Sequence, residues 1–180
     1  MEKSSFISFK FGVCLPSVDS NLSTLHGTFH ATPWVHKQTT HTRNTIRHFT
    51  DEEKQDKWAR IVAPVGSEGV VEKREATGPA PVHSSLTLHA SLISPSTTLT
   101  HILPPASNSL PSKAYVHLVQ TSGYNPREPN GAQITLSGPE GSSVELREGD
   151  GVYITGDAGQ TLSVRNSRDR VAEVLLFDVE

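Results

Sequence analysis

The sequence contains few of the residue types that define several protein classes. Its 180 residues include one cysteine and one methionine, and aromatic residues make up only 6%. With Cys14 alone, neither an intrachain disulfide nor a cysteine-rich zinc site can form, which is typical of a reducing compartment. No stretch approaches the roughly 20 apolar residues of a membrane span, and Lys10 interrupts the apolar segment near the start. We therefore expect a soluble intracellular protein, cytoplasmic or nuclear, that binds no membrane.

An excess of positive charge is also missing. The formal net charge is -3, from 16 Lys and Arg against 19 Asp and Glu, and the two signs are interspersed along the chain. Nucleic-acid binders usually carry a basic stripe, so a nucleic-acid partner is not expected. The 13 glycines and 12 prolines indicate many turns rather than long helices. The length fits one domain with, at most, a small appendage.

Residues 1–45 differ from the rest of the chain in composition and in hydrophobic pattern. They are rich in Ser, Thr, Asn and His and show no sustained period of 2 or 3.6 residues. Histidine-rich tracts can bind metal. The spacing of His36 and His41, however, matches no familiar ligand pair, and no cluster of cysteines or carboxylates accompanies them. We expect an irregular lead-in over residues 1–45, followed by one domain over residues 46–180.

A short helix is predicted directly after this lead-in. Thr50 and Glu53 have the spacing of a capping box, in which each side chain bonds the backbone amide of the other residue. Asp51 and Glu52 place negative charge in the first turn, where the helix dipole favours it. We expect a helix over 51–59 with a solvated charged surface.

From about residue 60 onward the pattern favours strands. Apolar and polar residues alternate over 86–92, and the run 114–119 does the same with both faces partly apolar. Further short runs lie near 131–136, 143–147, 151–155, 160–165 and 171–178, and turn residues such as Pro104-Pro105 separate them. Short strands at regular spacing are typical of a β-sandwich or barrel, so we expect an all-β fold.

Four segments carry a more specific resemblance. They are HFTDEEKQDKWARIVAP (48–64), KAYVHLVQTSG (113–123), LREGDGVYITGDAG (146–159) and AEVLLFDVE (172–180). In this order and spacing they resemble the C-terminal half of the pirin family, which includes the quercetinase-type bicupins. The resemblance runs from about residue 46 to the end. It implies a cupin barrel of the jelly-roll, double-stranded β-helix type.

The resemblance also implies where a metal would be bound. Full-length family members have two cupin barrels, and the N-terminal one holds an iron-type metal through three histidines and a glutamate. Residues 1–45 supply no such pattern. The chain therefore resembles the second barrel alone. A divalent metal is expected only if the native product includes the first barrel.

The second barrel can be compared with the cupin motifs position by position. Counting from Gly151 places Leu162 at the histidine position of the second motif, and counting from Gly149 places Gln160 there. Val116 occupies the glutamate position of the first motif. Because Leu and Val side chains donate no electron pair, they cannot bind a metal. We therefore expect no catalytic, cofactor-binding or metal-binding residues in this chain.

Two histidines are the weak remaining candidates for a metal site. His101 and His117 could converge, but non-haem iron needs about three donors on one face. The ordinary interpretation is that His117, between Val116 and Leu118, bonds a neighbouring polar group. His101 precedes a Pro-rich loop and is expected to be exposed.

These observations leave three functional hypotheses. The first is a metal-free, non-catalytic cupin module that binds itself or another cupin chain, because a barrel that lacks its partner should expose an apolar face. The second is a quercetinase-like dioxygenase that opens a flavonol or other small phenolic ring, or an accessory protein of a metabolic pathway. The third is a pirin-like transcriptional cofactor.

Overall fold

The computed structural model describes residues 47–73, 76–105, 111–120 and 131–179. The expected lead-in over 1–45 lies outside these residues, as do four of its histidines: His26, His30, His36 and His41. The described part of the chain contains no helix that qualifies as a membrane span. The elements, in chain order, are α1 (Asp51–Lys54), β1 (Ala59–Pro64), β2 (Ala80–Val82), β3 (Thr87–Ile93), β4 (Thr98–Ile102), β5 (Ser112–Leu118), β6 (Gln133–Ser137), the 3-10 helix η2 (Pro139–Gly141), β7 (Ser143–Arg147), β8 (Gly151–Gly156), β9 (Thr161–Asn166) and β10 (Ala172–Val179).

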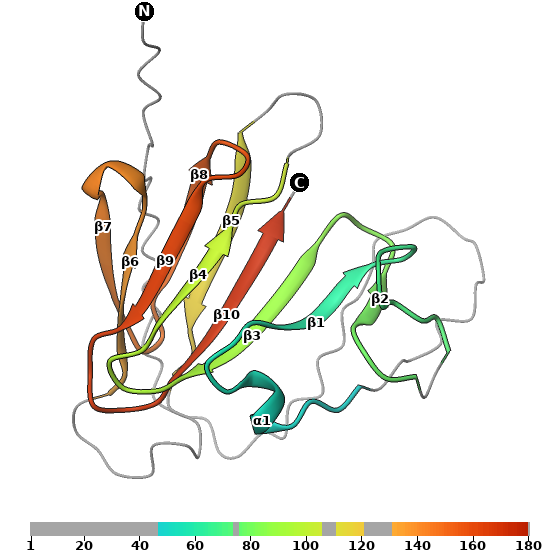
Figure 1. Cartoon of the computed structure of the whole chain (residues 1–180), viewed down its shortest axis with the longest axis horizontal. Helices are drawn as coiled ribbons and strands as arrows, with labels where there is room; N and C mark the ends of the chain where they lie inside the picture. Colours follow the sequence, from blue (N-terminus) through green and yellow to red (C-terminus); the bar gives the residue numbers. More distant parts are fainter. Residues whose placement is uncertain (1–46, 74–75, 106–110, 121–130, 180) are drawn as a thin grey trace, which may run out of the picture.

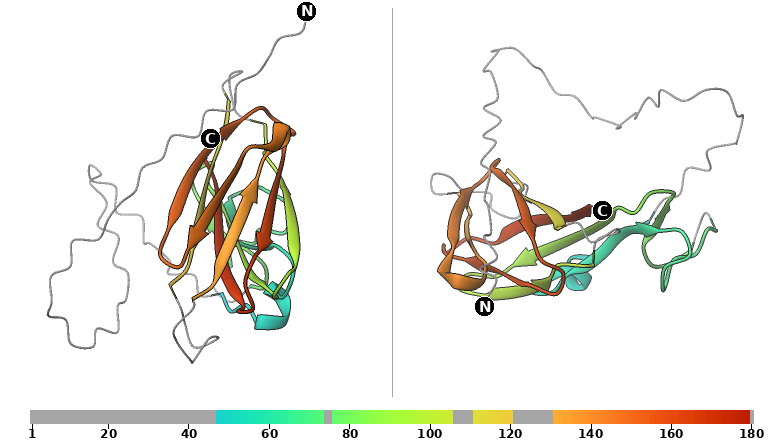
Figure 2. Two further views of the ribbon diagram at one scale, coloured as in Figure 1. Left: turned by 90° about the vertical axis from the view of Figure 1, so that its left-hand side faces the viewer. Right: turned by 90° about the horizontal axis from the view of Figure 1, so that it is seen from above.

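The strands form two sheets that face each other. One has the order β2-β1-β3-β10-β5-β8 and the other the order β4-β9-β6-β7. Apart from the parallel pair β1 and β2, all neighbouring strands are antiparallel. The four-stranded sheet lies over one part of the six-stranded sheet, while β1 and β2 extend beyond it (Figures 1 and 2). This is a two-sheet cupin barrel, so the predicted all-β fold is confirmed.

The core lies between the two sheets and follows the two-residue period of the strands. Along β10, Ala172, Val174, Leu176 and Asp178 are buried, and the residues between them are half-buried. Val116 and Leu118 of β5 join this core from the same sheet, and Leu162 and Val164 of β9 join it from the other sheet. Each alternate residue of a strand points to the same face, so the register of these pairs fixes which side chains enter the barrel.

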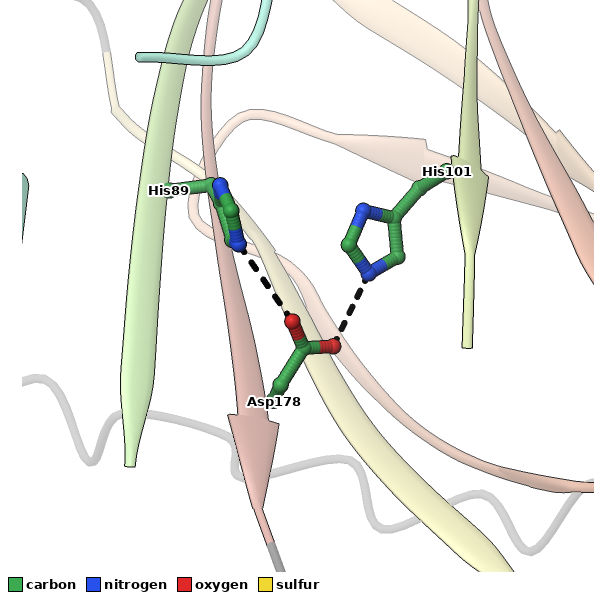
Figure 3. A group of neighbouring side chains, drawn as sticks. All are labelled: His89, His101 and Asp178. Carbon is green, nitrogen blue, oxygen red and sulfur yellow. Dashed lines mark hydrogen bonds and ion pairs between the residues drawn. The ribbon is translucent and has the colours of Figure 1, made fainter. Parts of the chain in front are cut away.

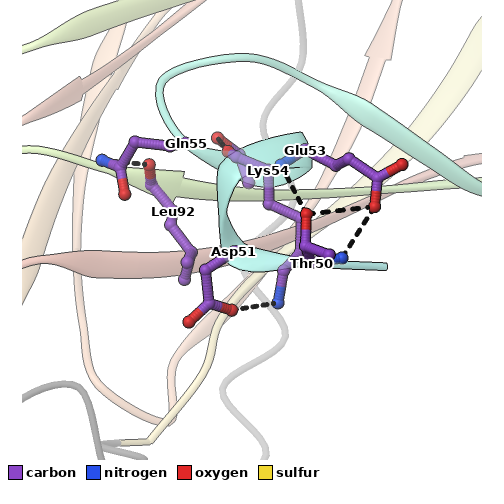
Figure 4. A network of polar contacts seen from close by, with 7 residues as sticks. Thr50, Asp51, Glu53, Lys54, Gln55 and Leu92 are labelled. Atoms are coloured by element: carbon purple, nitrogen blue, oxygen red, sulfur yellow. Dashed lines mark hydrogen bonds and ion pairs between the residues drawn. The ribbon is translucent and has the colours of Figure 1, made fainter. Parts of the chain in front are cut away.

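The capping box before α1 is confirmed, but the helix is shorter than predicted. The Thr50 amide donates to Glu53 Oε2 at 2.7 Å, and the Glu53 amide donates to Thr50 Oγ1 at 3.2 Å (Figure 4). The helix ends at Lys54 instead of residue 59. Gln55 is already extended and forms a bridge with Leu92 of β3, and Asp56 has a positive φ of 51°. Pairing with the sheet therefore replaces the helix after one turn.

The predicted strand runs match the observed strands to within about two residues. β7 has the predicted bounds, and β8, β9 and β10 each differ by only one residue at one or both ends. Three strands were not predicted, β1, β2 and β4. β2 is short and contains Pro81, and β4 is rich in Thr and lies at a sheet edge, so neither has a strong apolar alternation.

Asp56 anchors the segment after α1 to the end of β3. Its backbone amide donates to the Leu92 carbonyl at 2.9 Å. Its carboxylate accepts from the Ser94 amide at 2.7 Å, from the Ser94 hydroxyl at 2.8 Å and from Gln55 Nε2 at 3.3 Å. These bonds hold the chain in place as it enters β1.

We expect Asp56→Ala to lower the free energy of unfolding by about 1 kcal/mol, since it removes hydrogen bonds at an exposed site. Asp56→Asn should cost less, because asparagine tolerates the positive φ and keeps one acceptor oxygen. Urea unfolding measures both changes. The exposed Asp169 provides the control: Asp169→Asn should leave the midpoint unchanged. Equal midpoints for Asp56→Ala and wild type would contradict the anchoring role.

The effect of Asp56 should also depend on pH. Burial raises the pKa of Asp56, but the hydrogen bonds from Ser94 and Gln55 lower it more, so it lies below its ordinary value of 3.8. A carboxylate with a depressed pKa stabilises the fold above its unfolded-state pKa, and this contribution is lost as the pH falls through the folded-state pKa. The stability difference between wild type and Asp56→Asn should therefore be full at neutral pH and shrink below 3.8.

Candidate metal centre

Three side chains from three strands converge inside the barrel. His89 lies on β3, His101 on β4 and Asp178 on β10. Asp178 lies between the two imidazoles, with Oδ1 2.9 Å from His101 Nε2 and Oδ2 3.3 Å from His89 Nε2 (Figure 3). The rings of the two histidines meet edge to face with their centroids 5.3 Å apart. One donor atom from each residue lies within 4.8 Å of the others.

The strand register explains why these side chains point inward. His89 lies opposite Leu176 of β10, and Leu176 is fully buried in the core. Asp178 is two residues beyond Leu176, so it faces the same side of the sheet, in register with Ala114 of β5. His101 lies opposite the buried Leu162 in the other sheet. The cluster is thus enclosed by apolar side chains of both sheets.

The three side chains are largely buried, so solvent screens the interaction between the Asp178 carboxylate and the two imidazoles only weakly. The side chains of Asp178 and His101 are 8% and 10% exposed, and that of His89 is 16% exposed. Burial raises the pKa of Asp178, but hydrogen bonds from His101 and His89 and their positive charge lower it more, so the net pKa is below its ordinary value. Asp178 therefore stays ionised, and it is held in place by two charge-assisted hydrogen bonds.

One atom of the cluster is unsatisfied. His89 Nδ1 is buried and has no hydrogen-bond partner among the described residues. A buried polar atom without a partner costs free energy unless a water molecule or an ion satisfies it. In the metal-free protein the bond to the ionised Asp178 places a proton on His89 Nε2, and a metal ion bound at this nitrogen would displace that proton.

The chemistry of this cluster fits a metal ion. Two imidazoles and a carboxylate suit zinc, iron, nickel and copper ions. Two ligand atoms bound at about 2.1 Å to one ion lie roughly 3 to 3.4 Å apart. The observed separations of 2.9 and 3.3 Å between the carboxylate oxygens and the imidazole nitrogens fall close to that range. The residues that would hold the ion are therefore His89, His101 and Asp178.

The histidine pair considered from the sequence is not formed. His101 was expected to be exposed, but its side chain lies inside the barrel. His117 lies opposite Leu175, on the outer face of the six-stranded sheet, and its ring is parallel to that of Tyr115 at 6.4 Å. Since alternate residues of a strand face opposite sides, His117 cannot reach the cluster.

The two cupin-motif positions that hold apolar residues, Leu162 and Val116, lie in the same cross-strand rows as two of the candidate metal donors. Leu162 is the direct cross-strand partner of His101. Val116 lies opposite Leu176, which in turn lies opposite His89. His101 and His89 therefore lie in the cross-strand rows of Leu162 and Val116, and Asp178 lies two residues further along β10. Gln160 lies in the turn before β9, where its Oε1 accepts from the Asp157 amide at 2.9 Å.

His89 and Asp178 were not identified from the sequence. His89 belongs to the polar set of an alternating run, which is the usual pattern of a solvated face. In β3 the polar set, with Ser91, instead faces the core. The available signal was Asp178, an acidic residue at an alternate position of a strand that is otherwise apolar on that face. A buried carboxylate needs a partner, and this requirement points to histidines on adjacent strands.

Comparisons with known proteins give structural likenesses only. No family model and no curated protein matches the chain. YhhW from Escherichia coli has a TM-score of 0.45 and 20% sequence identity, over 68% of this chain and 38% of that chain. Bacterial pirin YhhW in complex with nickel(II), also from Escherichia coli, has a TM-score of 0.44 and 20% identity, over 68% of this chain and 39% of that chain.

The chain spans less than two thirds of the length of either pirin structure. An RmlC-like cupin protein from Desulfovibrio desulfuricans is similar over 80% of this chain and 97% of that chain, with a TM-score of 0.37 and 11% identity.

Removing the Asp178 carboxylate should destabilise the metal-free protein. Asp178→Ala leaves two buried imidazole nitrogens without their acceptor, and we expect a loss of about 2 to 3 kcal/mol. Asp178→Asn keeps the volume and one acceptor oxygen and should lose less. Chemical unfolding in the presence of EDTA measures both. His117→Ala, on the outer face, is the control, and a loss equal to that of Asp178→Ala would argue against a special role for the cluster.

Proposed function

We propose that this chain is a pirin-like cupin domain that binds one divalent transition-metal ion through His89, His101 and Asp178. The observation that carries the proposal is the convergence of these three donors from three strands inside the barrel. Charged and polar groups are costly in such a place unless they are paired or bind a metal. This proposal replaces the expectation that the chain has no metal-binding residues.

The donor set favours ions of intermediate softness. Imidazole binds zinc, nickel, copper and iron, whereas magnesium and calcium prefer sites made of oxygen atoms. Because His89 Nδ1 lacks the outer hydrogen bond that normally supports a ligand histidine, we expect an affinity about 10- to 100-fold weaker than that of a fully supported site. Three protein donors leave coordination positions for a further ligand. A bound ion would supply Lewis acidity at these positions.

This donor set also supports the second hypothesis from the sequence. Two histidines and one carboxylate with open positions are the arrangement used by non-haem iron oxygenases. An oxygenase acting on a small phenolic compound is therefore the second candidate function. The chain's own contribution would be to orient the ion from one side and to exclude water with the apolar side chains around the cluster. The transcriptional-cofactor hypothesis gains no support from this site.

Titration of the full chain with Zn²⁺ and Co²⁺ tests the proposal. We expect one ion per chain in isothermal calorimetry after EDTA treatment and dialysis. His101→Ala should abolish this binding because it removes one of three donors, and Asp178→Asn should weaken it because it removes the charge.

His117→Ala is the matched control, because the His117 imidazole lies on the outer face of the six-stranded sheet, away from the cluster. Its binding isotherm should equal that of the wild type. If wild type and His101→Ala bind the same amount of metal, the ions occupy other histidines of the chain, and the metal-free module becomes the better proposal.

Self-association is a separate candidate role, and it is supported by a patch of exposed aromatic side chains. Tyr115 and Tyr153 lie opposite each other on β5 and β8, and they are 37% and 40% exposed. Phe177 extends this aromatic patch, with its ring 6.0 Å from that of Tyr115. Since β8 is the edge strand of its sheet, a second copy of the chain can bring the same patch against it across a two-fold axis. Self-association is thus proposed alongside metal binding.

Light scattering coupled to size-exclusion chromatography should show a dimer that dissociates on dilution. Tyr153→Glu should shift the equilibrium to the monomer, because two copies would place like charges together in an apolar contact. Glu72→Gln, at an exposed position in the loop after β1, should leave the mass unchanged. A wild-type monomer at all concentrations would exclude the proposed dimer.

A further inference from the structure

Trp58 is the aromatic residue next to the proposed metal centre. It lies in the segment that leads into β1, directly before Ala59. Its Nε1 donates to the Thr100 carbonyl at 3.0 Å, and its ring meets the His101 ring edge-on at a centroid distance of 6.2 Å. The side chain is partly buried and packs against the core. Trp58 thus contacts both the backbone before His101 and the His101 ring itself.

The three proposed ligands are not equally well fixed by the sheets. His89 and Asp178 lie on β3 and β10, which are hydrogen-bonded neighbours, so strand register sets their separation. His101 lies on β4, in the other sheet, and β4 is an edge strand that pairs only with β9 in the described part of that sheet. The distance from His101 to the other two donors therefore depends on how the two sheets are held together.

Trp58 forms a direct connection at this point. Residue 58 enters the six-stranded sheet, whereas Thr100 belongs to the four-stranded one, so their hydrogen bond joins the two sheets one residue from His101. Trp58 is itself held from the other side, since Asp56 is bonded to Leu92 and Ser94 at the end of β3. The position of β4 is thereby tied to β3, the strand that carries His89.

We propose that Trp58 is a positioning residue of the metal centre, which holds His101 at binding distance from His89 and Asp178. The inference rests on the proposed function, because it assigns a role within that site. The indole N–H fixes the backbone at Thr100, and the indole ring restricts the rotation of the His101 imidazole. Residues that orient a metal ligand in this way typically change the affinity by about 10- to 100-fold when they are replaced.

The test compares Trp58→Leu with Trp58→Phe in the full chain. Leucine fills part of the volume but removes both the ring contact and the N–H, whereas phenylalanine keeps a ring edge near His101. For Trp58→Leu we expect the Kd for Co²⁺ to rise about 10- to 100-fold. Trp58→Phe should restore part of the affinity. The visible absorption of bound Co²⁺ should also differ from that of the wild type, because it reports the ligand geometry.

A control variant separates positioning from general destabilisation. Leu146→Ala truncates a buried core residue on β7, at the far edge of the four-stranded sheet. Urea unfolding shows how much stability each variant has lost. Leu146→Ala should lower stability without changing the Kd or the Co²⁺ spectrum.

The possible failures are distinguishable. If Trp58→Leu binds Co²⁺ with the wild-type Kd and spectrum while His101→Ala does not bind, Trp58 has no positioning role but the metal centre stands. If His101→Ala binds as the wild type does, the proposed function itself fails. If Trp58→Leu does not fold, Trp58→Phe decides, because an unchanged Kd and spectrum in that variant would overturn a role for the indole N–H.

Discussion

The carboxylate of Asp178 is a buried negative charge inside a mainly apolar barrel, and the arrangement of the cluster depends on it. An ionised carboxylate is tolerated in such surroundings only when its charge is compensated. Asp178 receives hydrogen bonds from His89 in its own sheet and from His101 in the facing sheet. One side chain thus specifies the orientation of two imidazoles and joins the two layers of the fold.

Two further polar contacts support this arrangement near His101. The Trp58 indole joins the sheets one residue away from His101, and Asp56 holds the preceding segment against the end of β3. Elsewhere the two sheets are held by aliphatic side chains such as Leu176 and Val164 and by the buried Asn166, whose Nδ2 donates to the Ile93 carbonyl at 2.8 Å. Apolar packing is non-directional, whereas hydrogen bonds fix angles. The hydrogen bonds around His101 therefore fix the orientation of its side chain more tightly than apolar packing alone would.

The sequence predicted the fold far better than the candidate site. Strand alternation and turn residues located seven of the ten strands, because these signals are local. The capping box located the start of α1 but not its end, which depends on the pairing of Gln55 with Leu92 from 37 residues away. His101 was selected and then paired with His117, since both lie near or in predicted strands. Which strands are neighbours, and which face of β3 enters the core, are tertiary properties that periodicity alone does not contain.

The cupin motifs and the candidate cluster test different properties of the chain. A motif tests fixed positions along the chain, but a metal ion requires only that donors meet in space. All inward-facing residues at one height of a barrel are neighbours, whichever strand carries them. Leu162 and Val116 stand at the motif positions, while His101 is the direct partner of Leu162 and His89 lies in the same row as Val116. An aliphatic residue at a motif position therefore excludes the motif's own ligand set, but it does not exclude a donor set on the adjacent strands of the same ring.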